Sequence, residues 1–258
     1  MKERYDISCL PAGLPVVVTG ATGGIGTEIA LALASMGVPM ILPCRNEKKY
    51  ETLRERILAA YPAAQISYVA LDLNSAQSVR DAAAAIAGKQ LAGIVNNAGI
   101  MCRHFTLSAD GPETTLNVNY FNTRLLNELL LPQVAHGGAL VFTTSVTRKA
   151  GHTDVLPEEV TEKNFSQLGT YGLSKKLITR YALALAPEAA AHGVRVNCAD
   201  PGIVNSGMIT MHRWYDPLAN IFFRPFIRPA RKGAVPALRA LFSPLTARIF
   251  TLRHIHRN

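Results

Sequence analysis

The sequence contains few cysteines, few aromatic residues and no long hydrophobic run. No apolar run approaches the roughly 18 residues that a membrane-spanning helix requires. The first 14 residues mix charges of both signs and lack the apolar core of a secretory signal, so we expect a cytoplasmic protein. The four cysteines are far apart and include no Cys-x-x-Cys pair, which argues against a disulfide framework and against a zinc site; they are Cys9, Cys44, Cys102 and Cys198.

Acidic residues are also scarce, since 18 Asp and Glu face 27 Lys and Arg, for a net charge of +9. The excess is local. Residues 206–258 hold nine Lys and Arg against one acid, Asp216, so the remainder is nearly neutral and we expect no binding to nucleic acid. We interpret residues 233–258 as a basic tail in solvent, with contact to an anionic membrane surface as the alternative.

His254 and His256 lack further ligands nearby, so we predict no metal site.

What the chain does contain is typical of a globular domain with a buried core. Almost half of the residues (48%) are hydrophobic, 17% are charged, and 258 residues suffice for one α/β domain. We therefore expect residues 1–258 to form a single domain, in which 203–232 cover the substrate.

Short apolar runs alternate with segments of helical periodicity. We predict strands at Val16–Val18, Met40–Leu42, Ile66–Leu71, Gly93–Val95, Ala139–Thr144 and Val194–Cys198. The predicted helices run from Ile25 up to Gly37 and over Glu47–Tyr61, Ser75–Ala87, Glu113–Leu131 and Thr170–His192. Repeated strand-helix units of this kind predict an α/β fold with a doubly wound parallel sheet.

A glycine-rich turn joins the first strand to the first helix. In this segment Gly20 permits a tight turn, Gly24 lets the backbone approach a pyrophosphate, and Gly26 allows the helix to pack closely on the strand. Glycines also occur in ordinary turns, but this position favours a dinucleotide site at the helix N-terminus. The predicted cofactor-binding residues here are Gly20, Thr22, Gly23, Gly24, Ile25 and Gly26.

The end of the second strand carries Arg45 where an NAD site usually presents an acid to the ribose. A guanidinium can bind a 2′-phosphate through two hydrogen bonds, whereas a carboxylate would repel it. NADP(H) is therefore favoured over NAD(H). The alternative is that Arg45 is a solvated loop residue.

Tyr171 and Lys175 lie four residues apart, on one face of a predicted helix. A nearby cation would stabilise the phenolate and lower the pKa of the tyrosine, so that the phenol could exchange a proton with a carbonyl or alcohol oxygen. Such a pair is weak evidence alone, because it arises easily by chance.

The order of the motifs is more specific. The glycine turn, Asn96-Asn97-Ala98-Gly99, Ser145, the Tyr171 and Lys175 pair and Pro201-Gly202 together resemble the short-chain dehydrogenase/reductase family, with its single Rossmann domain. The resemblance spans about Val16 to Ser206. The 26 residues from Ser145 to Tyr171, and Cys44-Arg45-Asn46, resemble the retinol-dehydrogenase-like branch.

The resemblance implies a role for each matching residue. Tyr171 would be the acid-base, Lys175 would lower its pKa and contact the nicotinamide ribose, Ser145 would bind the substrate oxygen, and Asn119 would hold a water in a proton relay. Further cofactor contacts are implied for Asp72, Leu73, Asn97, Ala98, Gly99, Pro201, Gly202, Ile203 and Ser206.

Neighbouring residues compete for two of these roles. Thr143, Thr144 and Thr147 are alternatives to Ser145, and Asn119 could instead be a capping amide, with Asn117 and Asn122 as competitors. Two positions depart from the branch pattern: Asn122 stands where glycine is common, and Asp200 precedes Pro201 where histidine is frequent.

The function predicted is that of an NADP(H)-dependent carbonyl reductase or alcohol dehydrogenase, working as a homodimer or homotetramer. Apolar residues after Gly202 suggest a hydrophobic substrate such as a steroid, retinoid or fatty-chain ketone, although they could equally be core or dimer contacts. These residues are Met208, Ile209, Met211, Trp214, Phe222, Phe223 and Phe226. The alternative functions are a non-catalytic dinucleotide sensor or scaffold, and an epimerase or dehydratase.

Overall fold

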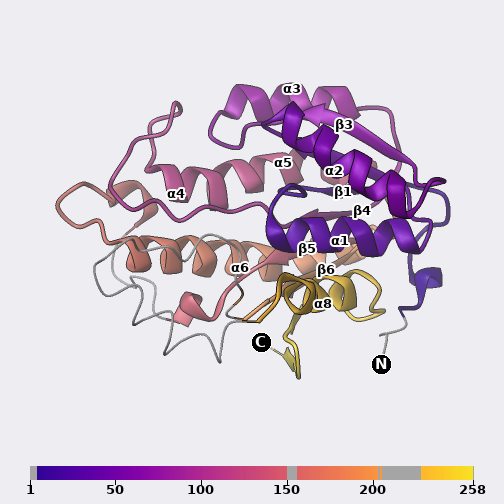
Figure 1. The fold of residues 1–258 in the computed structure, drawn as a ribbon. Coiled ribbons are helices and arrows are strands. Elements are labelled where there is room, and N and C mark those ends of the chain that lie inside the picture. Colours follow the sequence, from indigo (N-terminus) through magenta and orange to yellow (C-terminus); the bar gives the residue numbers. More distant parts are fainter. Residues whose placement is uncertain (1–4, 150–155, 203, 205–227, 258) are drawn as a thin grey trace.

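The computed structural model describes residues 5–149, 156–202, 204 and 228–257. A single sheet of eight strands runs through it, with helices on both faces (Figure 1). The strands are β1 (Val16–Val18), β2 (Met40–Cys44), β3 (Ile66–Ala70), β4 (Leu91–Asn96), β5 (Val134–Thr143), β6 (Arg195–Ala199), β7 (Arg248–Phe250) and β8 (Ile255–Arg257). The helices are α1 (Gly24–Ser35), α2 (Glu47–Ala60), α3 (Ala76–Ile86), α4 (Thr114–Leu116), α5 (Asn122–Leu130), α6 (Gln167–Ala191) and α8 (Ala230–Leu241).

The strands lie in the order β3-β2-β1-β4-β5-β6-β7-β8. All neighbouring pairs are parallel except β7 and β8, so the doubly wound parallel sheet is confirmed with one antiparallel strand added at its edge. The chain crosses over between β1 and β4, where the order reverses. In open α/β sheets the crevice at the carboxyl ends of such strands is the usual ligand site.

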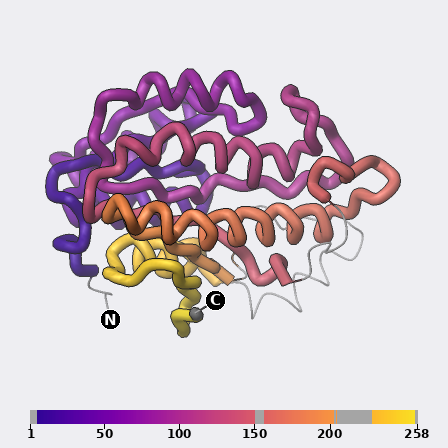
Figure 2. Tube along the Cα trace, turned by 180° about the vertical axis from the view of Figure 1, so that it is seen from behind, coloured from indigo at the N-terminus to yellow at the C-terminus, as the bar shows by residue number. Residues whose placement is uncertain are grey.

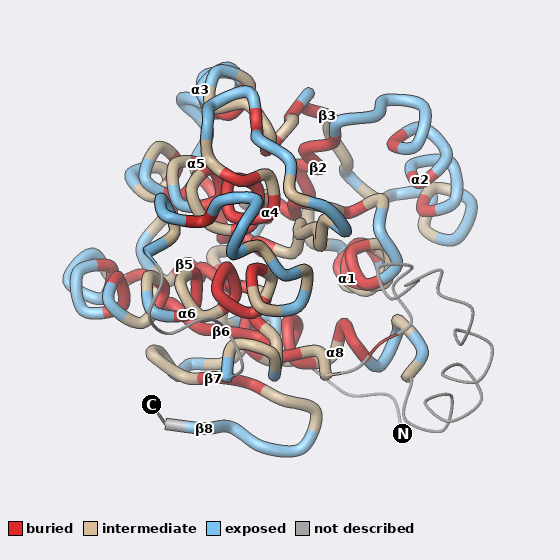
Figure 3. Tube along the Cα trace, turned by 90° about the vertical axis from the view of Figure 1, so that its left-hand side faces the viewer, coloured by how far each residue is buried: buried red, intermediate tan, exposed pale blue. Residues whose placement is uncertain are grey.

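Two layers of helices cover the sheet. Figure 3 shows α1, α2 and α8 on one side of the strands and α3, α5 and α6 on the other, and Figure 2 gives the view from behind. The alternation along β1 reflects this, because Val16 and Val18 belong to the first core and Val17 to the second. The inner strands β1, β2 and β4 are nearly continuous apolar runs because both of their faces are buried.

The segment expected as a basic tail forms part of the fold instead. In α8, Ala237 and Leu241 are buried against α1, and β7 pairs with β6 and buries Phe250. Arg253 and His254 are exposed in the turn between β7 and β8. The interpretation of this segment as a tail was therefore wrong, because its basic residues alternate with apolar residues that complete the core.

The predicted helix over Glu113–Leu131 is divided into three parts. A π-helical turn (Asn117–Phe121) separates α4 from α5, and the Thr123 hydroxyl donates to the Val118 carbonyl at 2.8 Å. Such π-turns are frequent at functional sites. Within the described residues, no helix combines the length and hydropathy needed to cross a bilayer.

Candidate active site

A cleft of about 530 Å³ opens at the carboxyl ends of the strands. Seventeen of the predicted site residues line it: Gly20, Thr22, Gly23, Gly24, Ile25, Gly26, Arg45, Asp72, Leu73, Asn97, Ala98, Gly99, Ser145, Tyr171, Lys175, Pro201 and Gly202. Asn119 is buried behind this lining. Ile203 and Ser206, like the aromatic residues of the predicted substrate-covering segment, lie outside the described residues.

The glycine turn has no room for side chains at two positions. Gly20 has a φ of +65°, and a Cβ there would lie 2.7 Å from the Cα of Ala98. A Cβ on Gly26 would overlap the carbonyl oxygen of Gly20. The turn therefore brings bare backbone to the cleft where α1 begins, and the first amides of a helix have no acceptor within the helix. Gly24, Ile25 and Gly26 occupy these first positions.

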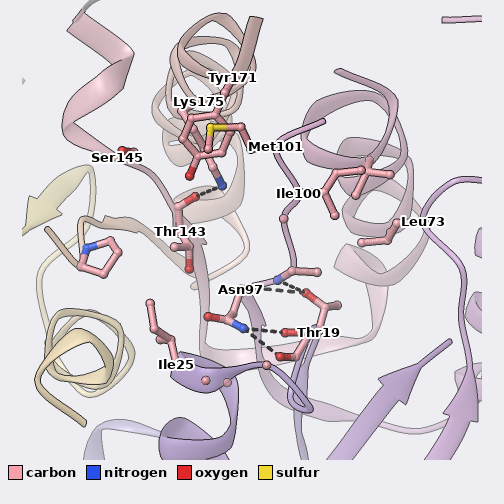
Figure 4. Close-up of a pocket in the computed structure, with 18 of the residues that line it drawn as sticks. Thr19, Ile25, Leu73, Asn97, Ile100, Met101, Thr143, Ser145, Tyr171 and Lys175 are labelled. Atoms are coloured by element: carbon pink, nitrogen blue, oxygen red, sulfur yellow. Dashed lines mark hydrogen bonds between the residues drawn. The ribbon is translucent and has the colours of Figure 1, made fainter. Parts of the chain in front are cut away.

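Asn97 holds this turn in place from the end of β4. Its amide Nδ2 donates to the carbonyls of Thr19 at 3.2 Å and Gly20 at 3.1 Å, while the Thr19 hydroxyl accepts from the backbone of Asn97 and Ala98 (Figure 4). The motif after β4 thus fixes the shape of the cofactor turn from a strand far along the chain. The sequence analysis placed Asn97 at the site but missed Thr19.

At the end of β2, Arg45 lies exposed at the lining of the cleft. Within the described part of the chain its guanidinium takes part in no salt bridge. Its neighbour Cys44 is buried, and burial raises the pKa of the Cys44 thiol to about 11 even though a hydrogen bond with Thr22 lowers it. The thiol is therefore inert at neutral pH, and Arg45 is the group here that offers a charge to a ligand.

The residues after β3 form another wall of the cleft, and a network of amides holds them. Asn122 Nδ2 donates to the Leu73 carbonyl at 3.0 Å and to the Asp110 carboxylate at 2.8 Å. Asp110 also accepts from Asn117 at 2.9 Å and from the backbone of Ala76. These hydrogen bonds lower the pKa of Asp110 against the opposing effect of desolvation. Asn122 departs from the branch pattern, and its amide supports the wall beside Asp72.

Tyr171 and Lys175 lie on α6 at the opposite end of the cleft, near Ser145 (Figure 4). Lys175 is 4% exposed, and its ammonium donates to the Thr143 carbonyl at 2.9 Å. The same nitrogen lies 5.7 Å from the centre of the Tyr171 ring. The predicted pair is therefore brought together, with Thr143 as a partner that the sequence analysis did not assign.

The pKa values of this pair differ from the prediction. Burial raises the pKa of Tyr171 to about 12; a hydrogen bond with Ser145 opposes this shift, and the charge of Asp200 adds to it. Burial also lowers the pKa of Lys175 to about 8. The predicted lowering of the tyrosine pKa was thus wrong, because desolvation of the phenol outweighs the hydrogen bond with Ser145 that lowers this pKa.

The hydroxyl of Ser145 differs from those of the neighbouring threonines. Ser145 Oγ accepts from the Thr147 hydroxyl at 2.9 Å and from its backbone at 3.2 Å, so its own proton points toward an acceptor in the cleft, on the side of Tyr171. Thr144 also belongs to the lining, but its buried Oγ1 lies 2.5 Å from Thr179 Oγ1 and is engaged there. Thr143 Oγ1 is buried without a partner among the described residues. The geometry favours Ser145 over the three threonines.

Asn119 lies in the π-helical turn with both ends of its amide engaged. Its Oδ1 accepts from the Ile100 backbone at 2.8 Å, and its Nδ2 donates to the Ile100 carbonyl and to Ser174 Oγ. A Cβ on Gly99 would lie 3.2 Å from Lys175 Nζ and 3.4 Å from Asn119 Oδ1. The Asn119 side chain therefore connects α6, through Ser174, to the loop after β4, close to Lys175.

These features fit a dinucleotide. Bare glycine backbone at a helix N-terminus suits a pyrophosphate, and Arg45 suits a further phosphate beyond it. No three His, Cys, Asp or Glu side chains among the described residues gather closely enough to hold a metal ion. Apolar residues also belong to the lining, including Ile100, Met101, Val146 and Leu168. Sequence reasoning missed these four, because loop residues carry no periodic signal.

Comparisons with known proteins agree with this geometry. The family model for short chain dehydrogenase matches residues 15–214. Retinol dehydrogenase 12 of Homo sapiens is 32% identical over 247 residues, which covers 93% of this chain and 78% of that protein. A crystal structure of a putative uncharacterized protein from Mycobacterium Paratuberculosis superposes with a TM-score of 0.76 at 26% identity, covering 96% of this chain and 85% of the other. A putative NAD(P) dependent gluconate 5-dehydrogenase from Beutenbergia cavernae with bound NADP superposes with a TM-score of 0.75 at 23% identity, over 95% and 96% of the two chains.

Proposed function

The chain belongs to the short-chain dehydrogenase/reductase family, in its retinol-dehydrogenase-like branch, and we propose on that premise that it transfers a hydride between NADP(H) and a hydrophobic ketone, aldehyde or secondary alcohol. The family membership makes it an NAD(P)-dependent oxidoreductase. The observation that carries the finer proposal is one cleft that contains the glycine turn, Arg45, Ser145 and the Tyr171 and Lys175 pair.

The phosphate-binding end of the cleft supports the preference for NADP(H). Gly24, Ile25 and Gly26 would offer backbone amides to the pyrophosphate, and Arg45 would bind a 2′-phosphate. Asp72 and Leu73 would border the adenine, while Ala98, Gly99, Pro201 and Gly202 would line the path toward the nicotinamide. The name of the retinol dehydrogenase relative suggests a hydrophobic alcohol or aldehyde as substrate.

At the catalytic end, Tyr171 is the proposed acid-base. The bound cofactor supplies or accepts the hydride. In carbonyl reduction the Tyr171 hydroxyl donates its proton to the substrate oxygen, and in alcohol oxidation the phenolate removes one. The raised pKa of Tyr171, about 12, keeps the phenol protonated at neutral pH, as proton donation to a carbonyl oxygen requires.

Ser145 and Lys175 assist this proton transfer. Ser145 Oγ already accepts two hydrogen bonds from Thr147, so it donates its proton toward the substrate oxygen and orients it. Lys175, held by the Thr143 carbonyl, places a positive charge near the ring, where it stabilises the phenolate left after proton donation. Asn119 positions the loop beside Lys175 through Ile100.

A hydrophobic substrate is supported by the apolar side chains around Tyr171. Val146 and Leu168 are 50% and 53% exposed although they line the cleft, so they present apolar area to whatever enters. A ligand with an apolar body and one carbonyl would cover this area and direct its oxygen toward Ser145 and Tyr171.

The proposal is tested by following NADPH consumption with the purified protein over steroid, retinoid and aliphatic ketones and aldehydes, and repeating each assay with NADH. We expect turnover of hydrophobic carbonyls with NADPH preferred. Preference for NADH would contradict the role of Arg45, and turnover restricted to small polar carbonyls would contradict the substrate class. Binding of NADPH without oxidation of it across the panel, with identical behaviour of Tyr171→Phe, would favour a sensor.

We propose a homodimer or homotetramer in the cytoplasm, which light scattering after size exclusion and cell fractionation test. Contact of the basic C-terminal region with an anionic membrane predicts co-sedimentation with liposomes that depends on anionic lipid. Equal sedimentation with neutral liposomes would remove the membrane idea.

A further inference from the structure

We propose that Arg148 and Asp200 form a positioning pair that holds Ser145 at a fixed distance from the turn at Pro201 and Gly202 and balances the charge beside Tyr171. The inference rests on the proposed roles of Ser145 and Tyr171 in catalysis. Neither member of the pair is a predicted site residue, and Asp200 stands where the branch pattern commonly has histidine.

The pair joins two loops at the carboxyl edge of the sheet. Arg148 lies three residues after Ser145, in a short helical turn (Val146–Lys149). Its Nη1 donates to the Asp200 carboxylate at 2.7 Å and to the carbonyl of Ser145 at 2.9 Å. One guanidinium nitrogen therefore ties the backbone of the proposed catalytic serine to the residue that follows β6.

Asp200 is anchored on its other side as well. Its second carboxylate oxygen accepts from the Gly202 amide at 3.0 Å, and its own backbone amide donates to the Phe250 carbonyl at 2.8 Å. The turn that lines the cleft at Pro201 and Gly202 is thus shaped by the same carboxylate that binds Arg148. Displacing this carboxylate would move both loops together.

Burial makes the pair sensitive to the loss of either partner. The side chains of Asp200 and Arg148 are only 3% and 15% exposed. A buried ion pair adds little net stability, but removing one partner leaves a charge without compensation in a poorly solvated place. At this position the uncompensated charge would face the proposed catalytic residues.

The charge of Asp200 is the one that acts on both Tyr171 and Lys175, and it raises the pKa of each. Other titratable groups also lie on the elements packed against α6. The buried Glu113 carboxylate accepts hydrogen bonds from Thr115 and from the Leu116 backbone at the start of α4. The remaining titratable groups on the described parts of these elements are Tyr120 in the π-helical turn, Cys198 and Arg195 on β6, and the exposed residues His136 on β5 and Lys149.

Asp200 raises the pKa of Tyr171, and we infer that Arg148 acts in the opposite direction by offsetting the charge of that carboxylate. Without the Asp200 carboxylate, Arg148 would be left as an uncompensated positive charge and the phenolate would be favoured. Without the Arg148 guanidinium, the carboxylate would repel the phenolate more strongly. A purely structural role would change stability or activity, but it would not shift the titration of Tyr171 in opposite directions.

The test is the pH profile of kcat/KM for oxidation of the alcohol that corresponds to a carbonyl found in the NADPH screen, measured with saturating NADP+ for Asp200→Asn, Arg148→Gln and the double variant. The positive charge of bound NADP+ should lower the Tyr171 midpoint into the measurable pH range. We expect the Tyr171-dependent midpoint to fall by about 0.5 to 1 pH unit in Asp200→Asn and to rise by a similar amount in Arg148→Gln. The double variant should return to within about 0.3 unit of the wild type. Lys149→Gln, the exposed neighbour, should leave the profile unchanged.

Arg148→Lys separates position from charge. It keeps the positive charge, so the midpoint should stay in place, but an ammonium cannot match the geometry of the guanidinium, so kcat should fall about tenfold. Unfolding temperature and NADPH affinity are measured for every variant. Should the neutral variants not fold, the same comparison is made with Arg148→Lys and Asp200→Glu, for which a retained midpoint with a lowered kcat is expected.

Two results would overturn the inference while leaving the proposed function intact. One is an inactive Tyr171→Phe together with midpoints that do not move in Asp200→Asn and Arg148→Gln, or that move in the same direction. The other is an unchanged kcat in Arg148→Lys. If Tyr171→Phe retains full activity, the proposed function itself fails.

Discussion

Lys175 donates a 2.9 Å hydrogen bond from its ammonium nitrogen to the carbonyl oxygen of Thr143. Thr143 ends β5, two residues before Ser145, so this contact joins the central strand to α6 at the place where the proposed catalytic groups meet. The interaction also provides a buried cation with an acceptor. It fixes Lys175 at a position from which its charge reaches the Tyr171 ring.

Replacing Tyr171 by phenylalanine removes the proton donor and retains the ring. We expect kcat/KM to fall by at least about 10²-fold, the usual contribution of acid-base catalysis, with NADPH affinity within about twofold of the wild type. Tyr181→Phe on the same helix is the matched control, since its hydroxyl is buried without a partner among the described residues. Equal losses in both variants would point to packing rather than catalysis.

Lys175→Met should stabilise the protein while it abolishes activity. The pKa of Lys175 is lowered to about 8 from 10.5, so the folded state carries the full cost of a buried charge below pH 8, and this cost disappears as the pH approaches 10.5. We expect the variant to gain about 1–2 kcal/mol of unfolding free energy at pH 7, after loss of the bond to Thr143.

The measurement for Lys175→Met is urea unfolding at pH 7 and at pH 10. The advantage of the variant over the wild type should shrink at the higher pH. An advantage that grows with pH would contradict the direction of the lysine shift.

Arg45→Gln should weaken NADPH binding by about 10- to 100-fold at low ionic strength, because a charge-assisted contact with the 2′-phosphate is lost. The affinity for NADH, which lacks that phosphate, should change less than about twofold by the same argument. Calorimetric titration of both cofactors measures this. Lys49→Gln on α2, which is exposed and outside the cleft lining, serves as the control.

Gly26→Ala should impair cofactor binding and stability together. The new Cβ would overlap the Gly20 carbonyl and lie 2.8 Å from both Ala21 Cα and Asn97 Nδ2, so the turn must shift. We expect a loss of about 1–3 kcal/mol of unfolding free energy. NADPH affinity should fall by about tenfold or more, as misplaced donors lose their hydrogen bonds.

Gly88→Ala provides the comparison for Gly26→Ala. Gly88 has a φ of +80° and open space around its Cβ position, far from the cleft, so alanine there should lower stability through backbone strain alone. Weakened NADPH binding in both variants would show that general destabilisation explains the effect.

Arg195→Met should destabilise the protein without changing kcat. The guanidinium donates to the carbonyls of Cys9 at 2.5 Å, Gly137 at 2.8 Å and Leu241 at 3.3 Å, and to that of Ser243, at the end of the sheet opposite the cleft. Loss of these bonds leaves partly buried acceptors unpaired, at a cost of about 1–3 kcal/mol. Urea unfolding and steady-state kinetics separate the two effects, and a lowered kcat at full folding would contradict this assignment.

Much of the fold could be predicted because the hydrophobic pattern of each segment reflects its place in a parallel sheet. The Val16–Val18 run is apolar because helices cover both faces of the sheet at this strand. Gly37 and Gly193 each follow the end of a helix by two residues, as their positions in the sequence predicted. β7 and β8 escaped prediction because each spans three residues and carries basic side chains. They belong to the sheet through pairing with distant strands, a contact that no local pattern encodes.

The candidate site shows the same limit. Motif order placed Tyr171, Lys175 and Ser145 correctly in one cleft, since the ends of parallel strands meet at one edge. The tyrosine pKa was mispredicted because spacing along a helix reveals a neighbouring charge but not burial. Arg148 and Asp200 are 52 positions apart, and the local sequence around either residue does not predict its partner.

The hydrogen bond from the Asp200 amide to the Phe250 carbonyl has a practical implication for proteolysis and for engineering the C-terminal region. A protease that cleaved the exposed turn after β7 would leave every cleft residue intact. Loss of β7 itself would remove the hydrogen bond that holds the backbone beside Pro201, and the cleft lining at Pro201 and Gly202 could then shift. Deletions near residue 250 should therefore behave as mutations of the active site, although none of the removed atoms reaches it.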